Sequence, residues 1–277
     1  MQKTINCRGK LVSLDTPKVM GILNLTPDSF FDGGKFDDKT KIFSQVEKML
    51  SEGADFIDIG AMSSRPGAAL ITVKEELERL IPVLKELVKS FPEALFSIDT
   101  FRAEVAKQSI ENGAAIINDI SGGNLDENMF KTIAKLKCPY ILMHMRGTPE
   151  TMNSLANYEN LTTDIIQELV FKIDKLIELN VSDIIVDPGF GFSKTVAQNF
   201  ELLKELVILK KIIDLPILVG ISRKSMIWRT LNVTANEALN GTTALNMIAL
   251  EKGSNILRVH DVKEAKETIT LFKALHN

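Results

Sequence analysis

The sequence has few cysteines and histidines and no excess of basic charge. It contains 2 cysteines, Cys7 and Cys138, and 3 histidines in 277 residues, in no arrangement that resembles a zinc site. Two distant cysteines are typical of reduced, packed thiols in a cytoplasmic protein. With 33 Lys and Arg against 36 Asp and Glu, the net charge is −3, which disfavours nucleic acid or an anionic membrane as the main partner.

Long hydrophobic runs are also missing. The longest stretches, such as 215–221, fall far short of the roughly 20 apolar residues that span a bilayer. The first four residues begin no apolar signal segment. No linker or low-complexity stretch divides the chain, and α/β barrels run to roughly 250 residues as one unit. We therefore expect one cytoplasmic domain over residues 1–277, without a membrane partner.

What the sequence does contain is a series of short apolar runs, each ending in a hydrogen-bonding residue. Continuous apolar runs are typical of buried parallel strands, and polar groups at their C-terminal ends mark the catalytic face of a (β/α)₈ barrel. A doubly wound open sheet is the alternative, but the even spread of polar residues over nearly all runs favours the barrel. The runs are 19–23 before Asn24, 56–57 before Asp58, 95–98 before Asp99, 115–117 before Asn118, 184–186 before Asp187, 217–221 before Ser222 and Lys224, and 256–259 before His260.

Helical periodicity fills the intervals between these runs. Thr72 and Glu75 form a predicted capping box, and Pro82 should kink the helix that follows or shift its start. A hairpin of residues 4–7 and 10–14 should plug the non-catalytic end of the barrel, and a further strand is expected near 140–143. The predicted helices are 38–52, the one that Thr72 opens, 103–112, 128–136, 163–180, 196–213, 226–231, 236–252 and 262–275.

Two long segments, 24–34 and 61–68, follow the first two strands. Because connections of this kind usually take about 2–6 residues, their length indicates a lid or a binding role. Phe30 and Phe31 support this interpretation, since such rings need a surface to cover.

Carboxylates and amides at the ends of several strands predict a site. Asp58, Asp99 and Asp187 should converge with Asn118. Each alone could simply cap a helix. Together they fit a divalent metal, or a planar heterocycle rich in hydrogen-bond donors. An apolar slot for such a ring would come from Met143, Phe192 and Ile120.

Basic residues follow the seventh and eighth strands. Residues 222–225 precede a short helix and could bind an anion, although a basic surface turn is the simpler interpretation. Arg258 and His260 alternate along a strand and match the phosphate site that barrels often build there, over which Arg65 could close. His144 is interpreted as a packing residue.

Together, these segments resemble the dihydropteroate synthases of folate biosynthesis. The motifs cover nearly the whole chain in order: 20–30 (MGILNLTPDSF), 32–34 (DGG), 64–67 (SRPG), 97–100 (SIDT), 117–120 (INDI), 187–192 (DPGFGF), 222–225 (SRKS) and 257–262 (LRVHDV).

The resemblance implies a reaction and roles for particular residues. A dihydropterin pyrophosphate would condense with p-aminobenzoate and release pyrophosphate, and the protein would be a homodimer packed through its later helices. Asn24 would bind Mg²⁺ on the pyrophosphate. By the same resemblance, the pterin would be held by Asp99, Asn118, Met143, Asp187 and Lys224, the pyrophosphate by Asn24, Arg65, Arg258 and His260, and p-aminobenzoate by Ser64, Arg65, Pro66, Phe192, Lys224 and Ser225. The catalytic residues would be Lys224, Arg258, His260 and Asp99.

The sequence departs from the family pattern at three positions, Met62, Ser64 and Phe31, where Glu, Thr and Ser are usual. All three lie in the long segments, so they bear on the p-aminobenzoate side. Alternative functions are a pterin-dependent methyltransferase, a Schiff-base aldolase that uses Lys224, and a non-catalytic pterin-binding relative.

Overall fold

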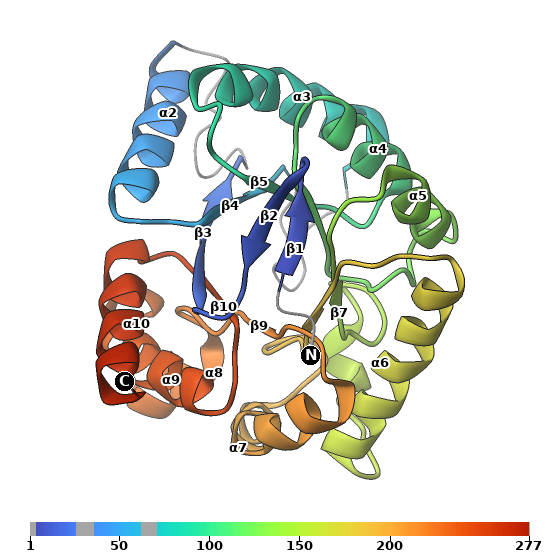
Figure 1. The fold of residues 1–277 in the computed structure, drawn as a ribbon. Coiled ribbons are helices and arrows are strands. Elements are labelled where there is room, and N and C mark those ends of the chain that lie inside the picture. Colours follow the sequence, from blue (N-terminus) through green and yellow to red (C-terminus); the bar gives the residue numbers. More distant parts are fainter. Residues whose placement is uncertain (1–3, 26–35, 62–70, 277) are drawn as a thin grey trace.

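The computed structural model describes residues 4–25, 36–61 and 71–276, with only the backbone of 36–38. Within these ranges, strands and helices alternate along the chain as predicted, and Figure 1 shows the helices as an outer ring around the strands.

Eight parallel strands form the barrel, in the order β8-β7-β6-β5-β4-β3-β10-β9. A parallel bridge between Val186 and Ile217 joins the two ends of this order and closes the sheet on itself. The closure confirms the (β/α)₈ barrel over the open sheet. The strands are β3 (Lys18–Asn24), β4 (Phe56–Gly60), β5 (Phe96–Asp99), β6 (Ile116–Asp119), β7 (Tyr140–Met143), β8 (Ile184–Asp187), β9 (Leu218–Val219) and β10 (Ile256–Val259).

The helices follow the predicted periodicity closely. Thr72 and Glu75 do form the capping box, and the helix after them begins at Val73 and contains Pro82, so the proline does not shift the start. The helices are α2 (Phe36–Ser51), α3 (Val73–Ser90), α4 (Ala103–Glu111), α5 (Met129–Leu136), η1 (Met152–Leu155), α6 (Leu161–Glu178), α7 (Val196–Ile213), α8 (Ser225–Leu231), η2 (Ala235–Glu237), α9 (Leu239–Glu251) and α10 (Val262–His276). Among these described helices, none is long and apolar enough to cross a membrane.

Two boundaries differ from the predictions. The single helix expected over 236–252 is a 3₁₀ turn, η2, followed by α9, because Thr234 and Glu237 close a capping box on the short turn. The run 217–221 contains only a two-residue strand, β9, with the bridge at Ile217 before it.

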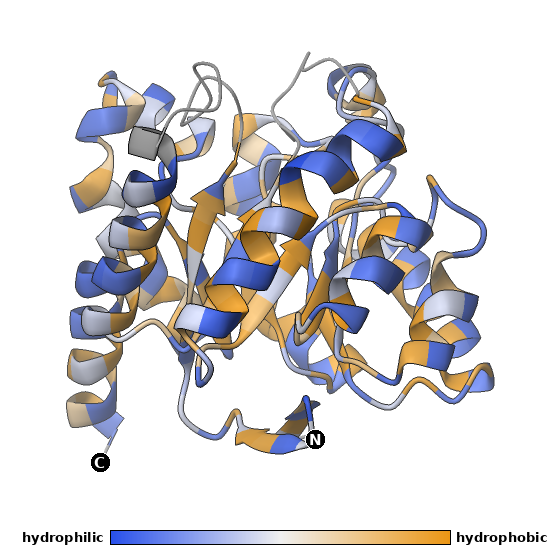
Figure 2. Cartoon of the chain, turned by 90° about the horizontal axis from the view of Figure 1, so that it is seen from above, coloured by the Kyte–Doolittle hydropathy of each residue, from blue (hydrophilic) through white to orange (hydrophobic). Residues whose placement is uncertain are grey.

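The N-terminal hairpin consists of β1 (Thr4–Cys7) and β2 (Lys10–Ser13) in antiparallel register. Figure 2 places it beyond the end of the barrel at which the strands begin. Ile5, Cys7 and Leu14 pack there against the first residues of the barrel strands, and the Asn6 N–H donates to Asp183 Oδ2 at 3.1 Å. The predicted plug is thus confirmed.

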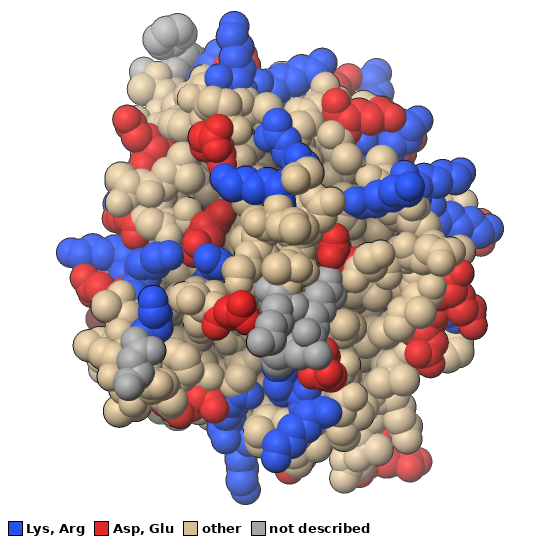
Figure 3. Space-filling model, viewed as in Figure 1, with Lys and Arg blue, Asp and Glu red and all other residues tan. Residues whose placement is uncertain are grey.

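Strand alternation places different residues inside and outside the barrel. Outward residues such as Ile57, Leu142 and Val219 pack with the helices in the largest apolar cluster. Figure 3 shows the face of the molecule that carries the hairpin, on which acidic and basic side chains are interspersed. The inward residues provide the site described next.

Candidate active site

The inward-facing side chains form an apolar layer at one end of the barrel and a polar layer next to it. The apolar layer contains Phe56, Ile116, Ile185 and Ile256, all fully buried. Two residues further along the same strands, on the same face, stand the polar residues Asp58, Asn118, Asp187 and Arg258. The period of two therefore places every change from apolar to polar at the same height in the barrel.

Arg258 is the centre of this polar layer. Its Nε donates to Asp58 Oδ2 at 2.7 Å, and its Nη2 donates to Asp99 Oδ2 at 3.0 Å. Asn118 Nδ2 donates to the same Asp58 oxygen at 2.9 Å. The other Asp58 oxygen, Oδ1, is buried without a hydrogen-bond partner among the described residues. Strands β4, β5, β6 and β10 thus meet in one hydrogen-bonded group.

Asp99 and Asp187 hold protons more tightly than exposed carboxyl groups do. Desolvation raises the pKa of Asp99 to about 7, although the charge of Arg258 opposes the rise. Desolvation also raises the pKa of Asp187, against the opposing charge of Lys224. A neutral, protonated Asp99 is a hydrogen-bond donor as well as an acceptor, which widens the set of ligand edges it can bind.

Lys224 lies between Asp187 and the loop after β8. Its Nζ donates to the Phe190 carbonyl and lies 4.7 Å from the centre of the Phe192 ring. Desolvation lowers the pKa of Lys224 to about 8, although Asp187 favours the charged form. The neighbouring Arg223 points elsewhere, with its Nε and Nη2 donating to the two Asp261 carboxylate oxygens at 2.8 and 2.7 Å. The basic turn predicted at 222–225 therefore divides into one residue that faces the site and one that does not.

An apolar wall borders the polar layer, as the sequence predicted. Met143, Ile120 and Phe192 belong to one cluster. The sequence interpretation missed the other buried members of this cluster, Phe101, Met145 and Met152. They follow strand ends or lie in a 3₁₀ turn, where neither strand nor helix periodicity marks an inward residue.

His260 lies apart from Arg258, at the exposed rim. Its Nδ1 is 3.0 Å from Ser222 Oγ, and the backbone N–H of His260 donates to that oxygen at 3.2 Å. Although the ring is at the surface, desolvation by nearby protein and the charge of Arg258 lower its pKa to about 4. Arg258 and His260 thus lie at different depths, and the described residues show Arg258 paired with carboxylates.

The remaining predicted residues have varied positions. Asn24 ends β3, half-buried, in register with Gly60, and Gly60 in turn is in register with Asp99. Ser225 is the first residue of α8. The residues Phe30, Phe31, Met62, Ser64, Arg65 and Pro66 lie outside the described residues.

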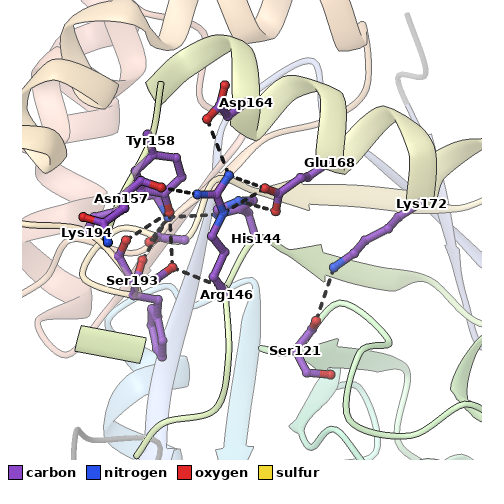
Figure 4. Close-up of polar contacts among 12 residues, drawn as sticks. Ser121, His144, Arg146, Asn157, Tyr158, Asp164, Glu168, Lys172, Ser193 and Lys194 are labelled. Atoms are coloured by element: carbon purple, nitrogen blue, oxygen red, sulfur yellow. Dashed lines mark hydrogen bonds and ion pairs between the residues drawn. The ribbon is translucent and has the colours of Figure 1, made fainter. Parts of the chain in front are cut away.

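His144 is buried, as the sequence interpretation proposed. It does, however, belong to a hydrogen-bonded network with Lys194, Glu168 and Arg146 that the sequence interpretation did not predict (Figure 4). Lys194 directly follows the 187–192 motif and a serine, and this closeness is the one sequence signal that pointed to it.

A comparison with protein families shows to which family the chain belongs. The model of the pterin binding enzymes matches residues 20–260, which include all of the described site residues. The chain belongs to this family. The barrel is therefore the fold of these enzymes.

Individual relatives agree with this assignment. The chain is 39% identical to the dihydropteroate synthase of Escherichia coli over 96% of its own length and 94% of that protein. It is 45% identical, over 93% of its length, to a folate synthesis bifunctional protein of Arabidopsis thaliana. The dihydropteroate synthase of Xanthomonas albilineans, solved with 4-aminobenzoic acid, superposes with a TM-score of 0.92 at 34% identity, and covers 100% of this chain and 99% of that one.

Several of the relatives are longer proteins. The chain spans 34% of a folic acid synthesis protein of Pneumocystis carinii and 56% of the Arabidopsis protein. It therefore corresponds to one part of these longer proteins.

Proposed function

We propose that the protein is a dihydropteroate synthase, which condenses 6-hydroxymethyl-7,8-dihydropterin pyrophosphate with p-aminobenzoate and releases pyrophosphate. The observation that carries the proposal is the buried layer of Asp58, Asp99, Asn118 and Arg258 beside Lys224, within a pterin-binding barrel. Named relatives that match almost end to end support it.

The pterin would bind across the polar layer. Its amino group and ring N–H groups need acceptors, which Asp99, Asp187 and Asn118 supply, and the apolar cluster that contains Met143 gives the ring a flat surface. Desolvation in this layer strengthens each hydrogen bond to the ligand. The raised pKa of both carboxyl groups is the expected consequence of such a water-poor site.

The reaction needs charge stabilisation more than a strong base. The attacking group is an aniline nitrogen, which is already neutral at pH 7. Departure of pyrophosphate from the CH₂ group leaves positive charge on the pterin and negative charge on oxygen. Carboxylates of Asp99 and Asp187 would stabilise the first, and Arg258, Lys224 and His260 would stabilise the second, in a dissociative substitution. This explains the many charged groups of the site.

The pyrophosphate would carry its Mg²⁺ to Asn24. Within the described residues, no group of three or more His, Cys, Asp or Glu side chains could hold a metal ion. One amide oxygen next to phosphate oxygens fits Mg²⁺, which usually reaches a protein with its phosphate ligand. The ion would supply neutralisation of the leaving oxygens. Arg65, which lies outside the described residues, would complete this side.

The p-aminobenzoate would lie near Phe192 and Ser225, with Ser64, Arg65 and Pro66 contributed from outside the described residues. Phe192 offers a ring face that already contacts Lys224 Nζ at 4.7 Å. An aromatic amine adjacent to that cation would lie close to the pterin side of Lys224, as a bond between the two substrates requires.

We further propose a homodimer that packs through the later helices. Large apolar side chains are exposed on α7, α8 and α10, among them Ile212 at 57%, Leu231 at 50% and Leu275 at 72%. Sedimentation of the protein and of Ile212→Glu tests this. The free, buried thiols of Cys7 and Cys138 support a cytoplasmic location, and we expect the chain to act as one domain.

The test of the function is direct. The purified protein is incubated with the dihydropterin pyrophosphate, Mg²⁺ and p-aminobenzoate, and dihydropteroate is measured by mass, with Lys224→Ala as the inactive control. Product from the wild type alone supports the proposal. Tight pterin binding without product would instead indicate a non-catalytic relative, and methyl transfer from a methylated pterin to a corrinoid would indicate the methyltransferase.

A further inference from the structure

Lys194 is a partly buried cation next to the site, and the proposed reaction does not use it. Its Nζ lies 3.0 Å from each of three acceptors, namely His144 Nδ1 and the carbonyl oxygens of Gly189 and Phe192. An ammonium group has three N–H donors, so this arrangement satisfies all of them without water. Desolvation lowers the pKa of Lys194 to about 7, although Asp187 opposes the change.

His144 is held as the acceptor for this lysine by its other ring nitrogen. His144 Nε2 lies 3.0 Å from Glu168 Oε2, so the hydrogen-bond pattern assigns the proton to Nε2 and leaves Nδ1 free to accept. Desolvation, together with the charge of Lys194, lowers the pKa of His144 to about 4, which keeps the ring neutral. Figure 4 shows Glu168 in contact with both His144 and Arg146, on the side away from Lys194.

The same network also fixes the chain just before Lys194. Ser193 is buried with a φ of +46°, in the left-handed region, where a non-glycine residue needs support. The Arg146 N–H donates to Ser193 Oγ at 3.0 Å, and Tyr158 Oη donates to the Ser193 carbonyl at 3.0 Å. The turn of residues 189–193 is therefore fastened through Lys194 and through Ser193.

This fastened turn provides the contacts on Lys224. The Phe190 carbonyl accepts from Lys224 Nζ, and the Phe192 ring lies 4.7 Å from that nitrogen. Gly191 packs so closely that an added Cβ would lie 3.0 Å from Lys224 Cδ. A shift of the turn by even a fraction of an ångström would move the groups that orient Lys224.

We propose that Lys194 is a positioning residue: clamped on His144, its ammonium holds the 189–193 turn so that Phe190 and Phe192 orient Lys224 toward the substrates. The proposal rests on the function proposed above for its kinetic part only. It assigns to the His144–Glu168–Arg146 network a role in the precision of the site, because the network holds the acceptor that Lys194 needs.

The chain offers a matched control in Lys210 at the opposite end of the barrel. Lys210 is also a desolvated lysine, with a pKa lowered to about 8, and its Nζ donates to the Leu215 carbonyl at 2.8 Å and to Asn255 Oδ1 at 2.9 Å. Lys194→Met and Lys210→Met therefore remove the same chemical group from similar surroundings, near and far from the site.

The test compares these variants by kinetics and by NMR of lysine-labelled protein. We expect Lys194→Met to lower kcat/KM for p-aminobenzoate by roughly 10- to 100-fold, as for a slightly misplaced site group, while Lys210→Met retains the wild-type value. Lys194→Arg should restore part of the loss. The Lys224 side-chain resonances, assigned by their loss in Lys224→Arg, should lose the ring-current shift of Phe192 in Lys194→Met alone.

Two failures remain distinguishable. If Lys194→Met leaves the Lys224 resonances unchanged, the positioning role is wrong, whatever the enzyme does. If the wild type makes no dihydropteroate, the proposed function is wrong, yet the resonances still report whether Lys194 orients Lys224. Should Lys194→Met not fold, His144→Leu removes one of the three acceptors and must cause a smaller change in the same direction for the proposal to stand.

Discussion

The two ends of the barrel use the same strands for opposite purposes. At the end where the strands begin, Phe56 and Ile256 meet the hairpin in a fully buried apolar layer. Two residues later on the same strands, Asp58 and Arg258 form a buried ion pair with an N–O distance of 2.7 Å. A step of about 7 Å along a strand separates these layers.

The stability of this fold and its chemistry therefore depend on different ends of the barrel. The apolar end gains free energy from burial and close packing. At the polar end, desolvation raises the pKa of Asp99 and lowers the pKa of Lys224. We therefore expect changes at the first end to affect unfolding and changes at the second to affect turnover.

Arg258→Ala should have the largest effect, because Arg258 contributes both to turnover and to the stability of the folded protein. We expect a loss of roughly 10²–10³ in kcat from removal of a charge-stabilising donor. We also expect a loss of about 3–5 kcal/mol in the free energy of unfolding, because Asp58 and Asp99 would stay buried without their cation. Steady-state kinetics and urea unfolding measure the two effects.

A second substitution separates the two effects of Arg258→Ala. Adding Asp58→Asn to Arg258→Ala removes a buried charge and should recover stability without recovering turnover. Near-normal kcat in either variant at saturating substrate would show that Arg258 has no role in the reaction.

Phe56→Ala tests the opposite end. Truncation of a fully buried phenylalanine should lower the free energy of unfolding by about 3–5 kcal/mol. The specific activity per folded molecule should remain that of the wild type, measured at a temperature below the lowered unfolding transition. A large fall in kcat with intact folding would contradict the division between the two ends.

Lys224→Ala should affect turnover with less effect on stability. We expect kcat/KM to fall by roughly 10²–10³. The folded environment disfavours the charge of Lys224, as its pKa of about 8 indicates, so its removal should destabilise the protein less than Arg258→Ala does. The two variants are compared in one urea series, and an equal loss of stability would contradict the expectation.

Asp99→Asn tests the pH dependence of stability at the polar end. The pKa of Asp99 is raised from 3.8 to about 7 in the folded protein, so between these values the folded state binds more protons than the unfolded state. The Asp99 contribution to stability is therefore present at low pH and is lost as pH rises to about 7. Asn cannot titrate, and the stability of the variant relative to the wild type should increase by up to about 1.4 kcal/mol per pH unit across this window.

Because two histidines also titrate, the test uses the difference in stability between Asp99→Asn and the wild type, and not the stability of either protein alone. The pKa values of His144 and His260 are lowered to about 4, so their contributions increase stability as pH rises through the same window. They are present in both proteins and cancel in the difference. A constant difference between pH 4 and pH 7 would show that Asp99 titrates normally.

Much of the fold could be predicted because its signals are local. Buried parallel strands require continuous apolar runs, and the capping box at Thr72 fixes a helix start within four residues of sequence. The closure by Val186 and Ile217 could not be predicted in the same way, because it joins segments whose pairing depends on the twist of the whole sheet.

The site residues also fall into those that local sequence predicts and those that depend on tertiary contacts. Asp58, Asp99, Asn118 and Asp187 were predictable because each ends or nearly ends an apolar run. The opposite orientations of Arg223 and Lys224 were not, because they depend on where Asp261 and the β8 loop lie. The partners of Lys194 come from residues 50, 5 and 2 positions away, which no sequence periodicity relates.

The amino-acid order specifies which residues lie inside the barrel and at which end of it, since alternation along a strand has a fixed period and the apolar runs stop where the polar layer begins. The closed barrel sets which of these groups pair, how far each is removed from water and which protons each one holds. Pairing and desolvation depend on distances between strands that are far apart in the chain, and these distances exist only once the barrel has closed.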